Sequence, residues 1–160
     1  MRFIGSALVA SAIVLGACGG GEKAPAADAA APAAAPAVAA TGTAAPITGT
    51  THEVKMLGDE KGYRFEPKDL TIKAGDGIKF VFVSGGPHNV AFNAADIPAD
   101  VVPQLDANFG ADKMAELSSK MTMNPGETVT ISFGNIKPGT YPFHCTPHLA
   151  LGMKGTITVQ

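Results

Sequence analysis

Cysteine is scarce in this chain of 160 residues, which contains only Cys18 and Cys145. A disulfide between them would tie an alanine- and proline-rich arm to a loop that also carries histidine, and it would explain neither neighbourhood. We therefore expect no disulfide framework. A hydrophobic core, together with any bound metal, must hold the fold.

Strong charge and long apolar runs are also missing. The formal net charge is −2, and no basic patch or ladder of aromatic residues points to a nucleic-acid partner. The apolar run over residues 3–15 follows Met1 and Arg2 and is too short to span a bilayer as a permanent helix. Its length and positive start predict a signal peptide over residues 1–17.

Cys18 follows this run directly behind the small residues Gly16 and Ala17, which resembles the acylation site of bacterial lipoproteins. Because an isolated thiol is a liability in an oxidising compartment, we expect Cys18 to be lipidated. The exported protein would then be anchored to a bacterial membrane, facing the periplasm or the exterior. The alternative is ordinary cleavage after a small residue, which would leave a soluble periplasmic protein.

Residues 18–50 consist mainly of alanine, proline, glycine and threonine and carry almost no charge. Such a composition cannot bury enough apolar surface to offset the entropy of ordering, and the prolines interrupt any helix. We predict a flexible linker over residues 18–50 and one folded domain over residues 51–160.

Apolar and polar residues alternate along several short stretches of this domain, as in half-buried strands, and one fuller apolar run suggests a central strand. The expected strands cover residues 53–56, 70–73, 78–83, 88–92, 128–133, 140–145 and 155–159. Glycine and proline turns separate them. The pattern predicts an all-β fold, an antiparallel β-sandwich.

Residues 93–120 depart from this pattern because they are rich in alanine, aspartate, leucine and lysine. We predict one short helix over residues 111–119 in this long connection. Met121 and Met123 follow it, and their spacing of two on the approach to a strand favours packing at the core or its rim over a copper-trafficking motif.

The stretch from Cys145 to Met153 places a thiolate, the imidazole of His148 and a thioether in one loop. His88 follows a Gly-Gly-Pro turn and offers a second imidazole. Sulfur ligands and imidazole suit copper, and two histidines with a cysteine and a distant methionine are typical of electron-transfer copper sites. Zinc is the main competitor, but zinc rarely takes a thioether, so Met153 favours copper.

The other two histidines are not expected to bind this metal. His144 precedes Cys145 on a strand, so its side chain should point to the opposite face. His52 lies at the edge of the domain and is expected to be solvated.

The stretches PHNVAF, NPGETVTISF, GTYPFHCTPHLALGM and KGTITV resemble segments of plastocyanin and its relatives among the small blue copper proteins. The resemblance implies a Greek-key, cupredoxin-like β-sandwich and one copper ion that alternates between Cu(I) and Cu(II). The ligands that it implies are His88, Cys145, His148 and Met153.

The resemblance also implies roles for neighbouring residues. Asn89 and Thr146 would form a polar pair that clamps the two ligand strands and tunes the metal. An apolar collar would surround the exposed edge of His148 and dock redox partners, and its members are Pro87, Leu149, Ala150 and Leu151.

His144 stands where plastocyanin has a tyrosine beside acidic patches, so the resemblance does not extend to a second electron route at that face. Charged side chains of the long connection should mainly steer encounters, and they are Asp96, Asp100, Asp106, Asp112 and Glu116, partly offset by Lys113 and Lys120.

These expectations describe a monomeric one-electron carrier and not an enzyme, because no His-x-His pair is present to build the oxygen site of multicopper oxidases. Its partners would be redox proteins such as a cytochrome, a photosynthetic reaction centre, a terminal oxidase or a nitrite reductase. The alternative is a copper chaperone or copper-storage lipoprotein. A structural lipoprotein with a degenerate domain is a third possibility.

Overall fold

The computed structural model describes residues 42–160. The predicted signal peptide, Cys18 and the linker as far as residue 41 lie outside the described residues. No helix within residues 42–160 has the length and apolar character that a membrane crossing requires.

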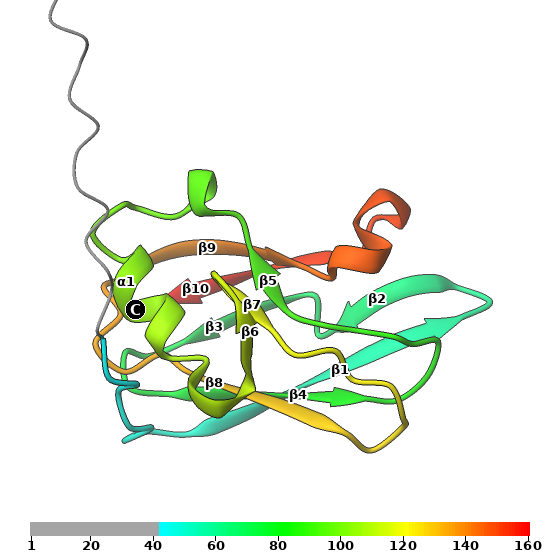
Figure 1. Ribbon diagram of the computed structural model, residues 1–160, viewed down its shortest axis with the longest axis horizontal. Coiled ribbons are helices and arrows are strands. Elements are labelled where there is room, and N and C mark those ends of the chain that lie inside the picture. Colours follow the sequence, from blue (N-terminus) through cyan, green and yellow to red (C-terminus); the bar gives the residue numbers. More distant parts are fainter. Residues whose placement is uncertain (1–41) are drawn as a thin grey trace, which may run out of the picture. The chain divides into compact units, whose positions relative to one another are not determined.

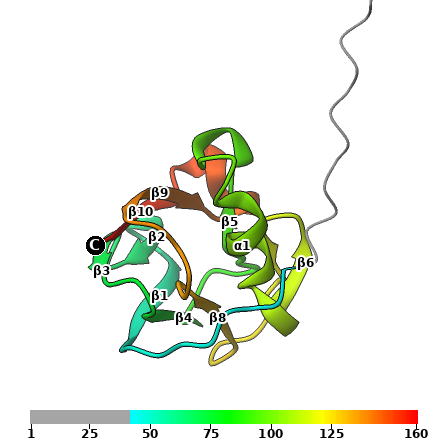
Figure 2. The same ribbon diagram turned by 90° about the vertical axis from the view of Figure 1, so that its left-hand side faces the viewer.

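Two β-sheets pack face to face (Figures 1 and 2). One sheet has the order β2-β1-β4-β8, with β1 (Thr51–Asp59), β2 (Gly62–Glu66), β4 (Gly77–Phe82) and β8 (Thr128–Ser132). The other has the order β3-β10-β9-β5-β7-β6, with β3 (Asp69–Ile72), β5 (Ala91–Phe92), β6 (Lys113–Ala115), β7 (Ser118–Ser119), β9 (Gly139–His144) and β10 (Lys154–Val159).

The chain passes repeatedly from one sheet to the other, which gives the predicted all-β Greek-key sandwich. Most strand pairs are antiparallel, but β1 with β4 and β3 with β10 run parallel. The sheets are therefore mixed, whereas the sequence pattern suggested antiparallel pairing throughout. Both parallel pairs join strands that are not consecutive in the chain, because strands in the other sheet lie between them.

The core lies between the two sheets and follows the alternation of the strands. Phe80 of β4 and Phe143 of β9 face each other across it, with ring centroids 5.6 Å apart, and Phe65 of β2 lies 4.7 Å from Phe143. All three rings are at most 2% exposed. Burial of such side chains contributes about 1.5–3 kcal/mol each, so this aromatic cluster joins the sheets firmly.

The predicted helix over residues 111–119 is wrong in position. The long connection holds one α-helix, α1 (Val102–Ala107), which has a proline in its first turn. Leu117 has a positive φ of 51°, which no right-handed helix can include. Asp106 accepts the Leu117 N–H at 2.7 Å and pairs with Lys113, so residues 113–119 fold back as the β6–β7 hairpin.

Short 3-10 helices η1 (Ala94–Asp96), η2 (Gly110–Asp112) and η3 (Thr146–Leu151) complete the structure. In Figure 1, η3 is the orange coil at the right-hand end of the sandwich, and α1 lies at the left-hand end. We call these the copper end and the far end.

Residues 42–50, which the sequence predicted as part of the linker, pack against the folded domain. They lie along the far end, where the N–H of Ala45 donates to Asn108 at 2.9 Å and the N–H groups of Thr48 and Gly49 donate to the Gly75 carbonyl, each at 2.9 Å. The described part of the predicted linker is thus hydrogen-bonded to the domain. The donors in this segment are backbone N–H groups, which every residue except proline supplies.

Candidate metal centre

The segments that carry the four predicted ligands meet at the copper end. His88 lies between β4 and β5 and forms an isolated antiparallel bridge with Thr122. Cys145 directly follows β9 as the N-cap of η3, His148 lies within η3, and Met153 precedes β10.

The loop is held closed by its own backbone. The N–H of Cys145 donates to the Met153 carbonyl at 3.0 Å, and the N–H of Met153 donates to the His148 carbonyl at 3.1 Å. Gly152 ends η3 with φ at 85°, a left-handed conformation that favours glycine and returns the chain toward the site. The spacing from Cys145 to Met153 thus corresponds to one short helical loop between two adjacent strands.

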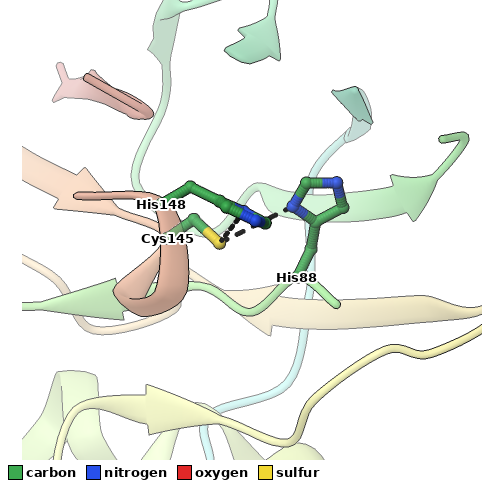
Figure 3. A group of neighbouring side chains, drawn as sticks. All are labelled: His88, Cys145 and His148. Atoms are coloured by element: carbon green, nitrogen blue, oxygen red, sulfur yellow. Dashed lines mark hydrogen bonds between the residues drawn. The ribbon is translucent and has the colours of Figure 1, made fainter. Parts of the chain in front are cut away.

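The side chains of His88, Cys145 and His148 point toward one another (Figure 3). One donor atom of each lies within 4.8 Å of the others, and within residues 42–160 they form the one such group of metal-binding side chains. The Cys145 Sγ lies 3.6 Å from the Nδ1 of His88 and 3.5 Å from the Nδ1 of His148. Cys145 and Met153 are fully buried.

Hydrogen bonding leaves the inner nitrogen of His88 free to bind a metal. Its Nε2 lies 2.8 Å from the Ser84 carbonyl, which can only accept, so Nε2 carries the proton. The neutral ring then presents an unprotonated Nδ1 to the site. Burial lowers the pKa of His88, which favours this neutral form.

His148 reaches the surface by one edge. No side-chain nitrogen or oxygen that is buried within residues 42–160 lacks a hydrogen-bond partner, and the Nε2 of His148 has no partner in this part of the chain. That nitrogen is therefore in contact with solvent, and the residue is 7% exposed against 0% for His88. Burial lowers the pKa of His148 as well, with a smaller contribution from His88.

Burial raises the pKa of the Cys145 thiol, while the N–H groups of Asn89 and His148 oppose that rise. The N–H groups would stabilise the thiolate that a metal requires. Binding of a metal at neutral pH should therefore displace the thiol proton.

Asn89 and Thr146 connect the two ligand segments. The Asn89 side-chain oxygen accepts the Thr146 N–H at 2.7 Å, and its amide nitrogen donates to the Thr146 hydroxyl and to the Ser118 hydroxyl, each at 3.1 Å. Asn89 is 2% exposed. These bonds hold the segment of His88 against the segment of Cys145.

Tyr63 of β2 is a neighbour of the site that sequence reasoning missed. Its ring stacks on the His148 ring, with centroids 3.7 Å apart and an interplanar angle of 14°. No local pattern around Tyr63 signals this contact, because it joins residues 85 positions apart in different elements.

His144 lies apart from the metal-binding group. It is half-buried and lines an open groove on the side of the sheet, together with Phe92, Asp96 and Lys154. His52 is not simply solvated: its Nε2 lies 2.9 Å from the Asp76 carboxylate at the far end. Met123 is 62% exposed and so does not pack in the core.

Exposed apolar residues lie next to His88 and His148 along the chain. Leu149 is 47% exposed and Leu151 is 62% exposed, and Pro87 and Ala150 are exposed as well. We call these four residues the copper-end patch.

The donor set suits copper. Two imidazole nitrogens, a thiolate sulfur and a nearby buried methionine combine ligands that copper accepts in both oxidation states. The Cys145 sulfur and the Nδ1 atoms of His88 and His148 face one another, so the site presents three donor atoms to a metal before it binds. Copper is the cofactor of this domain.

Comparisons with known proteins agree with this interpretation. The chain is 41% identical over 118 residues to plastocyanin of Prochlorothrix hollandica, covering 74% of this chain and 79% of the relative. It is 44% identical over 113 residues to plastocyanin of Nostoc punctiforme, covering 69% and 74%. A mutant plastocyanin of fern, known in oxidised and reduced structures, is 34% identical with a TM-score of 0.48 and covers 68% of this chain and 99% of its own.

The sequence profile described as copper binding proteins of the plastocyanin/azurin family matches residues 52–160, which include every residue of the site. The chain belongs to the plastocyanin/azurin family of copper binding proteins.

Proposed function

We propose that this protein is a one-electron carrier that acts on the outer side of a bacterial membrane. The observation that carries the proposal is the closure of the donor set: Cys145 and Met153 are fully buried, and only one edge of His148 meets solvent. Bound copper supplies the couple between Cu(II) and Cu(I). The protein holds the donor atoms in one arrangement, which keeps reorganisation small when the charge changes.

The exposed edge of His148 is the proposed exit for the electron. It lies within the copper-end patch, and exposed apolar residues around a buried redox site fit transient docking of a partner protein. Such a contact brings the partner's cofactor near the imidazole without a deep or permanent interface. The partners are redox proteins: a cytochrome, a reaction centre, an oxidase or a reductase.

A copper chaperone or store would need to release its metal. Here the thiolate and thioether donors have no exposed surface, and the backbone of the ligand loop is closed by hydrogen bonds. These features favour retention of the metal. Repeated oxidation and reduction in the presence of an acceptor apoprotein tests this: a carrier keeps one copper per chain, whereas transfer of copper to the acceptor would support the alternative.

We further propose that Cys18 is lipidated and that residues 19–41 tether the domain to the membrane. The support is the sequence before Cys18 and the composition after it. Gly19 after the cysteine lacks the aspartate that commonly retains lipoproteins at an inner membrane, so in a cell with two membranes the periplasmic face of the outer membrane is the expected site.

Fractionation of cells that express the full chain tests the anchor. Wild type should sediment with membranes, because several acyl chains together hold far more firmly than one, and Cys18→Ala, which lacks them, should move to the soluble fraction. A Cys18→Ala chain that still sediments with membranes would refute lipid anchoring at this residue.

The carrier role is tested by mixing the reduced, copper-loaded protein with native membranes and with candidate soluble cytochromes. Oxidation on the millisecond to second scale by one of them, and rereduction by another component, is expected. Reduced protein that none of these preparations oxidises would contradict the carrier role.

A further inference from the structure

Tyr63 covers one face of a metal ligand. Its ring is stacked on His148 at 3.7 Å and meets His88 edge-on at 6.2 Å with an interplanar angle of 69°. His148 retains little exposed surface, although it lies in a loop at the end of the sandwich. The Tyr63 ring therefore fills the space into which the imidazole could otherwise turn.

The strand pairing explains how Tyr63 is held there. In the β1–β2 hairpin Gly58 pairs directly with Tyr63, and a Cβ on Gly58 would lie 2.6 Å from the Tyr63 Cε1. That distance is shorter than real Cβ contacts, so any side chain at residue 58 would displace the ring. Gly58 is needed here for close approach.

The same hairpin also supports the other imidazole. The Gly58 N–H donates to the Ser84 carbonyl at 2.8 Å, and that carbonyl accepts the Nε2–H of His88, also at 2.8 Å. The β1–β2 hairpin thus contacts His148 by stacking and His88 through one shared carbonyl. The hairpin itself contributes none of the four ligands.

We propose that Tyr63 is a positioning residue of the copper centre, which fixes the ring plane of His148 before the metal binds. Stacked aromatic pairs contribute stabilisation beyond their buried area. Because the stack is made by protein groups alone, part of the cost of ordering His148 is met during folding and not on copper binding. The inference concerns the site and does not depend on which partners exchange electrons with it.

Three variants separate positioning from general stability. Tyr63→Leu removes the aromatic face but keeps apolar bulk, and Tyr63→Phe keeps the face and removes the hydroxyl. Tyr141→Phe is the matched control, because Tyr141 is the other tyrosine of the chain and its hydroxyl donates to the Lys137 carbonyl at 2.7 Å, away from the site.

Copper affinity should fall roughly 2- to 10-fold in Tyr63→Leu and stay within about 2-fold of wild type in Tyr63→Phe. Tyr141→Phe should lower resistance to urea but leave copper affinity unchanged. In NMR spectra of the metal-free protein, the His148 ring protons should lose their upfield ring-current shift in Tyr63→Leu and keep it in Tyr63→Phe.

Equal copper affinity and unchanged His148 shifts in Tyr63→Leu would overturn the proposal. So would a Tyr63→Phe variant that loses as much affinity as Tyr63→Leu, since the hydroxyl and not the stack would then be responsible. Should Tyr63→Leu fail to fold, the wild-type spectrum still decides: contacts between the Tyr63 and His148 rings must be seen in the metal-free protein, and their absence refutes the stack.

Discussion

The copper end and the far end of the sandwich both bury polar side chains, but they satisfy them differently. At the far end the Asp76 carboxylate accepts hydrogen bonds from the N–H groups of Thr50 and Lys73 at 2.8 and 3.0 Å, and it lies 2.9 Å from His52. At the copper end the Cys145 sulfur faces two imidazole nitrogens at 3.5 and 3.6 Å. Sulfur contacts of this length are weak.

The far end is therefore completed by the protein itself, whereas the copper end presents donor atoms that a metal completes. Asn108 illustrates the first case: its side chain accepts from Ala45 and donates to the Gly134 carbonyl, each at 2.9 Å, and so joins three segments. The difference predicts that changes at the far end alter stability without changing the colour of the copper site, and that changes at the copper end do the reverse.

Replacing the sulfur ligand should have the largest effect. Cys145→Ser puts a hydroxyl where the thiolate binds, and the intense blue band that arises from thiolate-to-copper charge transfer should disappear entirely. The fold should persist, because serine is similar in size and the aromatic cluster of Phe65, Phe80 and Phe143 that joins the sheets is unchanged. Absorption spectra of the copper-loaded variant, with Asp76→Asn as a control that should stay blue, provide the measurement. A blue Cys145→Ser protein would mean that the ligand assignment is wrong.

Removing the far-end carboxylate should have the next largest effect. Asp76→Ala leaves the N–H groups of Thr50 and Lys73 without their acceptor, and hydrogen bonds to charged groups contribute about 1.5–3 kcal/mol each. We expect the free energy of unfolding in urea to fall by about 1.5–3 kcal/mol in total. The visible spectrum should keep its shape. Loss of the blue band with unchanged stability would invert the comparison between the two ends.

The same carboxylate predicts how stability depends on pH. Hydrogen bonds from Lys73, His52 and Thr50 lower the pKa of Asp76 from 3.8 to about 2, with Lys73 contributing most. Because the folded pKa lies below the unfolded one, this stabilisation is complete above pH 3.8 and is lost as the pH falls toward about 2. Urea unfolding of the metal-free protein should follow this decline, and in Asp76→Asn the decline should be smaller. An equal decline in both would show that other groups are responsible.

The sequence predicted the parts of the site that depend on local spacing. The loop from Cys145 to Met153 is one short helix between adjacent strands, so its ligands are fixed by their distance along the chain. Strands β4, β8, β9 and β10 were also predictable, because their apolar residues alternate or run together as burial requires.

Features that depend on contacts between distant segments could not be predicted in this way. Tyr63 reaches His148 only because β2 packs beside η3, and residues 42–50 join the domain through backbone groups that leave no trace in composition. The helix was misplaced because residues 111–119 include alanine, lysine, methionine, glutamate and leucine, which favour helix, whereas the contacts of Asp106 fold the stretch into a hairpin.

Two faces near the metal differ as routes for the electron, and here the expected effect is the smallest. The copper-end patch is apolar, and three of its four residues lie in η3 with His148. The groove beside His144 carries both signs of charge, since Asp69, Asp96 and Glu116 line it together with Lys68 and Lys154. Opposite charges at close quarters largely offset one another for a distant partner, so this face offers little electrostatic steering.

Leu151→Asp places a charge in the copper-end patch, outside the groove that His144 and Leu149 line, and should slow electron transfer to the physiological partner roughly tenfold, which corresponds to about 1.4 kcal/mol of lost docking energy. The colour and the reduction potential should stay nearly unchanged, because Leu151 is 62% exposed. His144→Phe alters the other face and should change the rate less than about 2-fold, since that face contributes little steering. Stopped-flow kinetics at two ionic strengths measures both variants with the same partner. If His144→Phe slowed transfer more than Leu151→Asp did, the electron would leave through the groove beside His144, and the apolar patch would have another purpose.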